Sequence, residues 1–272
     1  QCTAAHQGDG TYSCTWDSSS KSTGWYNVTM IATRTNYNSG TTLQQNTFFL
    51  SRVPQLDNSQ VQPYPTGSWE IKPFNFSVYI TDLDKENVLT NLWLKNSTSN
   101  WFTENSTNCS NCNNYFFMTN KNFTCGNIDQ WQAKFNSSSF TSFKKETSLI
   151  AFNVTKSAIS INYGEGNNSV VNRSDNAPNN TAIFSVQIWN LVLNNYTTVI
   201  PTTSVLTWVM NDTTNWKEEL ENYNATHYYL NFNPGCDYLP GVSKWKVNSS
   251  DSCYADNSSA EFYVTITGNL TN

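Results

Sequence analysis

The segment FNFSVYIT, residues 74–81, alternates apolar and polar side chains and decides the fold class of this chain. By the two-residue period of a β-strand, one face of this segment carries Phe74, Phe76, Val78 and Ile80. Similar short runs, rich in β-branched and aromatic residues and separated by Asn, Ser and Gly clusters, recur along the 272 residues. The pattern predicts an all-β protein made of tandem immunoglobulin-like β-sandwich domains.

The strand-like runs divide the chain into three predicted domains, 1–52, 53–155 and 156–272. The first holds only about three strands, which are too few for the two sheets of a sandwich, so we expect it to be incomplete. Its missing strands would belong to a longer parent chain or come from another subunit. The polar, proline-bearing residues 53–67 are predicted to be a linker into the second domain. The acidic segment 214–229 is predicted to form a short helix or a loop.

Seven cysteines indicate an exported protein with disulfides. Two pairs lie close enough in sequence to act as local bridges, Cys2–Cys14 and Cys236–Cys253. Each would stabilise the fold by about 3 kcal/mol through the loop that it closes.

The other three cysteines form a central cluster that can make only one internal bridge. The candidate bridge is Cys112–Cys125. Which of Cys109, Cys112 and Cys125 stays unpaired is left open. Zinc is the alternative for the Cys-x-x-Cys spacing, but a fourth ligand is missing.

Asn-x-Ser/Thr sequons occur seventeen times and predict a heavily N-glycosylated surface. Charged residues make up only 13% of the chain, so glycans would supply the solubility that charge does not. Where a sequon falls in a predicted strand, its asparagine points away from the apolar face. The acceptor asparagines are Asn27, Asn75, Asn96, Asn105, Asn108, Asn122, Asn136, Asn153, Asn167, Asn172, Asn179, Asn195, Asn211, Asn224, Asn248, Asn257 and Asn269.

Charge and hydropathy restrict the partners. The net charge of −5 without a basic cluster argues against nucleic acid. No apolar stretch reaches eighteen residues, so no membrane span is predicted.

The segment TDLDKEN is the candidate calcium site, with Asp82, Asp84 and Glu86 at alternate positions. Calcium takes six to eight oxygen ligands, so backbone carbonyls or another loop would have to contribute, and an ordinary acidic turn is the alternative. A second candidate, around Glu165, is weaker. No other cofactor is expected.

Catalysis finds little support in the sequence. The two histidines, His6 and His227, lie outside any nucleophile motif, and His227 is expected to be a structural strand residue. We therefore expect no enzyme. Among the ten tryptophans, Trp25 and Trp101 are expected to be exposed.

Two stretches resemble a known class of proteins. GDGTYSCTWDSSSKSTGWYNVTMIATRTNYNSGTTLQQNTFFL and NFNPGCDYLPGVSKWKVNSSDSCYADNSSAEFYVTITGNL are similar to the tandem immunoglobulin-like repeats of large secreted surface proteins of archaea, particularly methanogens and their relatives. The resemblance covers roughly the first and last 50 residues. It implies a β-sandwich fold, a cell-envelope location and a Cys236–Cys253 bridge.

These features predict an extracellular structural glycoprotein of a cell surface. Its copies would build a filament, sheath or surface layer by β-strand or edge complementation, with the C-terminal NLTN or the QVQPYP segment as donor. The alternative is an adhesin or receptor ectodomain that binds a ligand through the loops at one end of a sandwich.

Overall fold

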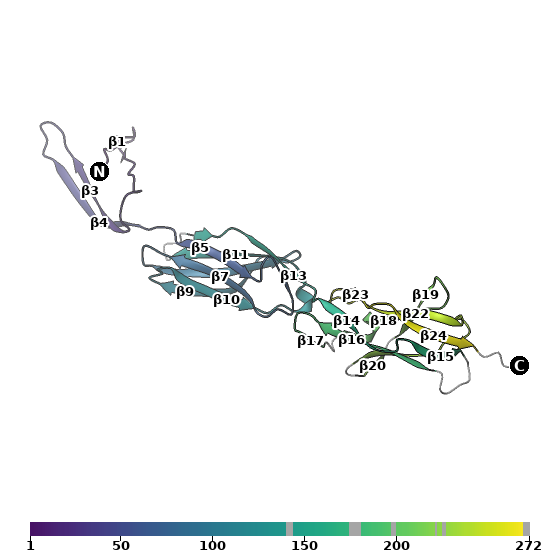
Figure 1. Ribbon diagram of the computed structural model, residues 1–272. Helices are drawn as coiled ribbons and strands as arrows, with labels where there is room; N and C mark the ends of the chain where they lie inside the picture. The colour runs from purple at the N-terminus through teal and green to yellow at the C-terminus, as the bar shows by residue number, and fades with distance from the viewer. Residues whose placement is uncertain (140–143, 174–180, 197–199, 221, 225–226, 269–272) are drawn as a thin grey trace.

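The computed structural model describes residues 1–139, 144–173, 181–196, 200–220, 222–224 and 227–268. Figure 1 shows three parts in a row, with a long hairpin at one end and two β-sandwiches after it. Within the described ranges the regular structure is β-strand, apart from the 3-10 turns η1 (Cys125–Asn127) and η2 (Thr202–Ser204). The predicted all-β class is confirmed.

The first sandwich packs a three-stranded sheet against a six-stranded one. The smaller sheet has the order β10 (Tyr115–Lys121), β7 (Phe74–Thr81), β5 (Gln55–Gln62). The larger has the order β6 (Thr66–Ser68), β13 (Ile150–Thr155), β11 (Asp129–Ser139), β8 (Asn87–Asn96), β9 (Phe102–Ser110), with β12 (Lys144–Glu146) paired to β11.

The second sandwich repeats this plan. One sheet has the order β14 (Ile159–Glu165), β16 (Ala182–Asn190), β21 (Tyr228–Phe232), β20 (Asn222–Tyr223), with β17 (Asn195–Tyr196) on β16. The other has the order β15 (Ser169–Arg173), β24 (Phe262–Gly268), β22 (Gly241–Ser249), β18 (Val205–Met210), β19 (Trp216–Leu220), with β23 (Asn257–Ser258) on β22.

Both sandwiches have the strand order of an immunoglobulin-like fold, with strands A, B and E in one sheet and C, F and G in the other. In each, the chain leaves strand A and crosses to the opposite sheet, where β6 and β15 pair in parallel with the G strands β13 and β24. A glycine stands at each crossing. A Cβ on Gly67 would lie 2.3 Å from Pro63 Cγ, and Gly166 has φ +104°. The crossings therefore depend on residues without a side chain.

Each sandwich buries its own apolar core. In β7 every second side chain is buried, as the alternation of residues 74–81 predicts. Phe74 and Phe76 contact Phe152 from the opposite sheet, with ring centroids 5.9 and 5.6 Å apart. In the second sandwich Phe184 stacks on Trp245 at 4.5 Å. These aromatic contacts between facing sheets hold the layers together.

The first 52 residues form two hairpins and, within the described residues, no sandwich. The strands are β1 (Ala5–His6) with β2 (Tyr12–Ser13), and β3 (Gly24–Ala32) with β4 (Gly40–Leu50). Three strands are predicted here; two long ones form, and the third is reduced to the residue pair Tyr12–Ser13. Large apolar side chains stay exposed, including Trp25 at 63% and Ile31 at 64%. As expected, residues 1–52 do not form a two-sheet sandwich, while their assignment as a partial immunoglobulin-like domain and the boundaries of the three domains stay predictions.

Two of the predicted connections are wrong. Residues 53–67 are not a plain linker, because Gln55–Gln62 form the edge strand β5, which buries Val61 and is polar on its open side. The acidic segment 214–229 contains the edge strand β19, paired to β18, rather than a helix. An edge strand is covered by the core over less of its length than a central strand, and β5 fully buries only Val61, so its alternation is weak.

Candidate functional site

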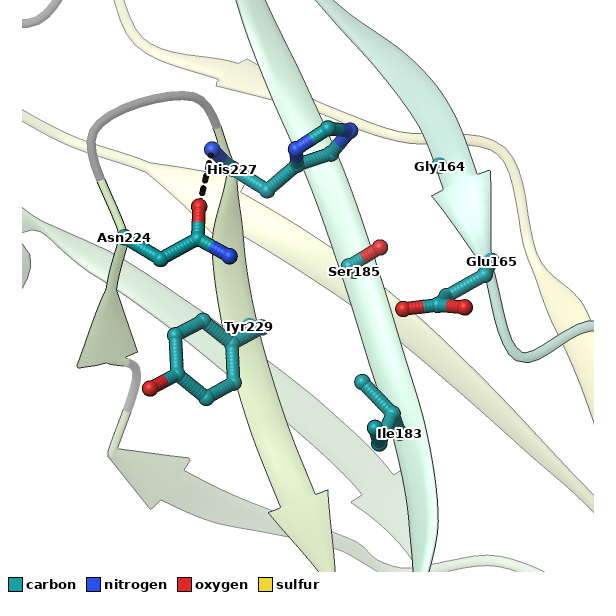
Figure 2. Close-up of a pocket in the computed structure, with 7 residues that line it drawn as sticks. All are labelled: Gly164, Glu165, Ile183, Ser185, Asn224, His227 and Tyr229. Carbon is teal, nitrogen blue, oxygen red and sulfur yellow. Dashed lines mark hydrogen bonds between the residues drawn. The ribbon is translucent and has the colours of Figure 1, made fainter.

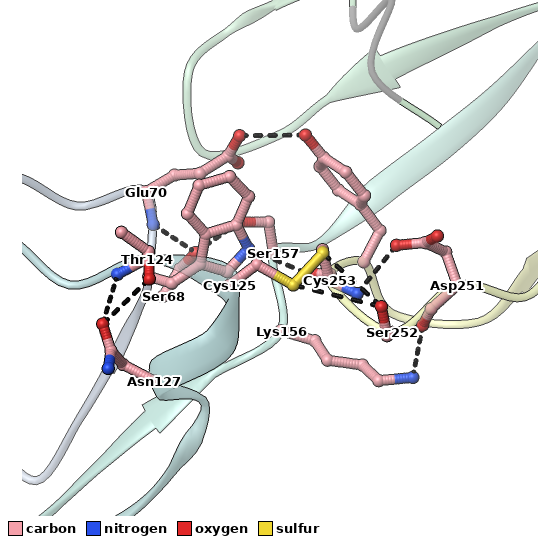
Figure 3. The surroundings of a disulfide bond; sticks show 12 residues. Ser68, Glu70, Thr124, Cys125, Asn127, Lys156, Ser157, Asp251, Ser252 and Cys253 are labelled. Atoms are coloured by element: carbon pink, nitrogen blue, oxygen red, sulfur yellow. Dashed lines mark hydrogen bonds between the residues drawn. A yellow bond between two sulfur atoms is a disulfide. The ribbon is translucent and has the colours of Figure 1, made fainter. Parts of the chain in front are cut away.

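The junction between the two sandwiches combines a disulfide, a shared aromatic side chain and buried hydrogen bonds (Figure 3). A disulfide joins Cys125, in η1 of the first sandwich, to Cys253, in the loop between β22 and β24 of the second. The two Cα atoms are 5.1 Å apart, and 128 residues separate them in sequence. Closing so long a loop restricts the unfolded chain by about 5 kcal/mol in the chain-entropy description.

Trp69 connects the two cores at this junction. It follows β6 of the first sandwich, and its ring packs against the apolar clusters of both sandwiches. Its Nε1 donates a hydrogen bond of 2.8 Å to the carbonyl oxygen of Cys253, and its ring meets Tyr254 edge-on at 6.0 Å. One side chain therefore spans the boundary with both its apolar body and its polar tip.

Glu70 is the carboxylate of the junction and is only 8% exposed. Its Oε1 accepts a hydrogen bond of 3.1 Å from the Tyr254 hydroxyl, and its Oε2 accepts one from Asn190 Nδ2. Asn190 and Tyr254 are both buried in the second sandwich. A carboxylate of the first sandwich thus satisfies two buried donors of the second, and each hydrogen bond gains strength from the charge.

The covalent connection is short. Only Lys156, Ser157 and Ala158 separate β13 from β14. Ser157 N donates to the Cys253 carbonyl at 3.0 Å, its carbonyl accepts from Ala255 N at 2.8 Å, and its hydroxyl bonds to Ser68. The linker is therefore itself bound into the second sandwich, which leaves little freedom for a change of angle.

The observed disulfides correct the predicted ones. Cys2–Cys14 is confirmed. Cys236–Cys253 is wrong, because Cys253 pairs with Cys125 and Cys236 is exposed and unbonded.

The central cluster does form one internal bridge, but it is Cys109–Cys112 rather than Cys112–Cys125. Cys125 lies at the end of the sandwich that meets the second one, where a cysteine far along the chain is nearer than its neighbours in sequence. The Cys-x-x-Cys spacing is therefore occupied by a disulfide and not by zinc.

The predicted glycan acceptors lie on accessible positions. Two, Asn179 and Asn269, fall outside the described residues, and none of the other fifteen is buried. The asparagines with the most exposed side chains are Asn27, Asn105, Asn108, Asn122, Asn167, Asn195 and Asn224. Half-buried are Asn75, Asn96, Asn136, Asn153, Asn172, Asn211, Asn248 and Asn257. Glycosylation itself stays a prediction.

The candidate calcium residues are used in separate contacts. Asp82 is buried, and its Oδ2 accepts from Glu86 N at 2.7 Å, which closes the turn after β7. Burial raises the pKa of Asp82 above its ordinary value. Asp84 Oδ2 accepts from Ser51 Oγ at 2.8 Å and from Arg52 N.

The other carboxylate oxygens of Asp82 and Asp84 are buried without a hydrogen-bond partner. A cation would suit two such oxygens. However, the part of the chain that the structure describes contains no group of three or more His, Cys, Asp or Glu side chains able to hold a metal ion. Calcium therefore stays a prediction.

A shallow hollow lies on the second sandwich over β14, β16 and the start of β21 (Figure 2). Glu165, Ser185 and His227 gather there with Asn224 and Tyr229. Gly164 keeps the hollow open, since a Cβ on it would lie 2.5 Å from Ser185 Oγ. The lining offers hydrogen bonds to a polar ligand. The expected absence of enzyme activity stays a prediction.

The two tryptophans expected to be exposed differ. Trp25 is exposed on β3, beside Phe49 at 5.5 Å. Trp101 is only half-exposed, because Lys95 and Lys134 lie over its ring at 5.2 and 5.0 Å. These two cation–π contacts cover part of the Trp101 ring.

No family model and no curated protein matches this chain. Within the described residues, no helix has the length and apolar character needed to cross a membrane.

Proposed function

We propose that this chain is a structural glycoprotein of a cell surface, a subunit of an extracellular filament, sheath or surface layer. The observation that carries the proposal is the junction, where a disulfide, a shared tryptophan and a buried carboxylate fix one sandwich on the next. A protein that transmits force or keeps a lattice spacing needs this rigidity, whereas a flexible linker is the usual connection between domains.

The acceptor asparagines support a location outside the cell. None of the fifteen described ones is buried, and seven are exposed, as an oligosaccharide requires. Disulfides also persist in oxidising compartments. The resemblance to the secreted repeat proteins of archaea favours a cell envelope as the place of work.

The β3–β4 hairpin suggests how copies assemble. Ile31 and Leu43 are exposed on one face of it, and within the described residues β3 and β4 pair only with each other. An exposed apolar hairpin with open edges is a template for pairing with another chain. Of the two predicted donors, QVQPYP overlaps β5, which already pairs with β7, and NLTN lies outside the described residues. The β3–β4 hairpin of a second copy is the partner we favour.

Electron microscopy of native material tests the proposal. We expect ordered assemblies in which the two sandwiches repeat as one unit. The double variant Ile31→Lys, Leu43→Lys should abolish assembly and leave the sandwiches folded. Leu149→Lys, at an exposed leucine of the first sandwich, is the matched control and should assemble. Monomers alone at high concentration would contradict the polymer and favour the adhesin or receptor ectodomain.

Glycopeptide mapping tests the glycan coat. Asn27, exposed on β3, should be occupied. Asn257 should be empty, because its Nδ2 donates to the Ile159 carbonyl and a glycan there would break this contact. A bare Asn27 together with a modified Asn257 would contradict the predicted surface.

A further inference from the structure

Cys125 and Cys236 occupy equivalent places in the two sandwiches. Each lies in the connection between the E and F strands, Cys125 between β10 and β11 and Cys236 between β21 and β22. Cys125 precedes its F strand by four residues and Cys236 by five, since β11 begins at Asp129 and β22 at Gly241. The position is therefore a repeated feature of the sandwich and not an isolated cysteine.

The two cysteines differ in their bonding. Cys125 is joined to Cys253, in the loop between the F and G strands of the following sandwich. Cys236 is exposed and unbonded. The other six of the seven cysteines are in disulfides, so this chain has no thiol left for Cys236.

Cys236 lies near the end of the second sandwich at which β24 finishes. A Cβ on Gly268, the last residue of β24, would lie 3.3 Å from Pro240 Cγ, and Arg173 Nη1 donates to the Tyr238 carbonyl at 2.9 Å. Figure 1 shows β24 running toward the C-terminal end of the row. In the first sandwich, the corresponding end meets the second sandwich.

The surface around Cys236 has apolar side chains that no described residue covers. Leu239 is 54% exposed and Val242 is 73% exposed, and both line a shallow hollow with Met210 and Pro240. At the end of the first sandwich, Trp69 and Cys125 lie under the second sandwich instead. The end that bears Cys236 thus has a free thiol and exposed apolar side chains, as a junction would, but no described sandwich covers it.

We propose that Cys236 forms a disulfide with a cysteine in the F–G loop of another immunoglobulin-like domain, as Cys125 does with Cys253. Each thiol loses one proton and one electron, and the two electrons reduce the disulfide of an external thiol oxidant to its dithiol. The link rests on the extracellular location proposed above, where such bonds persist. A second copy of this chain does not offer the partner, because Cys253 is the one cysteine in its F–G loops and is bonded to Cys125. The link therefore joins the second sandwich to a different immunoglobulin-like domain.

Disulfide mapping of native material tests this link. Free thiols are alkylated with iodoacetamide before digestion, and the non-reduced peptides are identified by mass spectrometry. We expect Cys236 in a cross-link to an F–G-loop cysteine other than Cys253. An alkylated Cys236, a Cys236–Cys236 bridge or a bond to a cysteine outside an F–G loop would each overturn the proposal.

Gel mobility and a variant complete the test. If reduction leaves the mass unchanged, the partner domain belongs to the same polypeptide, and if the mass falls, it belongs to another. Cys236→Ser should remove the cross-link and keep Cys125–Cys253, whereas Asn233→Ser, an exposed position in the same connection, should keep both. Assemblies seen by microscopy with an alkylated Cys236 would refute this link alone and leave the proposed function standing.

Discussion

The two junctions of this chain are built in different ways. Between the sandwiches, a disulfide, Trp69 and the buried Glu70 fix a linker of three residues. Between the hairpin and the first sandwich, Asp84 holds Ser51 and Arg52 by hydrogen bonds at a partly exposed position. The difference indicates a rigid pair of sandwiches with a separately attached hairpin.

Removing the disulfide should have the largest effect on this contrast. The double variant Cys125→Ser, Cys253→Ser should lower the free energy of unfolding by about 4 to 5 kcal/mol, because the bridge closes a loop spanning 128 residues. Chemical denaturation of both proteins measures the change.

The matched control is Cys109→Ser, Cys112→Ser, whose bridge spans only three positions within one sandwich. It should cost about 2 kcal/mol. Equal losses in the two double variants would show that the long-range bridge does not constrain the junction.

Glu70→Ala is expected to follow. The change leaves Asn190 Nδ2 and the Tyr254 hydroxyl buried without their acceptor. At about 1 to 2 kcal/mol for each unsatisfied group, the loss should be about 2 to 4 kcal/mol. Glu146→Ala, at an exposed ion pair, should change stability by less than about 1 kcal/mol in the same thermal or urea experiment. A loss of unfolding free energy no larger than that of the control would show that Glu70 does not stabilise the junction.

Asp84→Ala should loosen the first junction more weakly, by about 1 to 2 kcal/mol, because it removes acceptors from Ser51 and Arg52. Limited proteolysis should cut near residues 51–54 faster than in the unchanged protein, while the sandwiches stay intact. Unchanged cleavage would mean that the hairpin is held by other contacts.

Asp82→Asn should have the smallest effect, visible mainly as a change in pH dependence. Burial raises the pKa of Asp82, so the folded state holds its proton more tightly than the unfolded chain. The stabilisation from protonated Asp82 is complete below the unfolded pKa and is lost as pH rises through the folded pKa. The asparagine variant lacks this loss, so its stability relative to the wild type should increase with pH across the acidic range.

Urea unfolding at a series of pH values measures this difference. A difference that stays constant, or that falls as pH rises, would contradict the buried-carboxylate description. Repeating the series with added calcium checks the predicted cation site: a gain in stability that Asp82→Asn abolishes would support it.

The sequence reveals the fold class because central strands bury one whole face. Residues 74–81 and 182–189 alternate for that reason, and both are central strands. The sequence pattern does not identify the edge strand β5, because its polar open side resembles the composition of a linker.

The junction could not be predicted from the sequence for another reason. A cysteine's partner is chosen in space, and the separation of 128 residues between Cys125 and Cys253 leaves no local signal. Nothing in the sequence around Glu70 indicates that the second sandwich buries it and bonds to its carboxylate. Only the order of cysteines around the F strands could have signalled the junction.

The central claim is that the two sandwiches form one rigid unit. In the isolated chain, where Cys236 is unbonded, spin labels at Cys236 and at an introduced Lys145→Cys, an exposed position on β12, allow the distance between the sandwiches to be measured by pulsed electron paramagnetic resonance. A single narrow distance distribution is predicted, which should broaden when the Cys125–Cys253 bridge is removed. A distribution that is already broad in the bridged protein would contradict the claim.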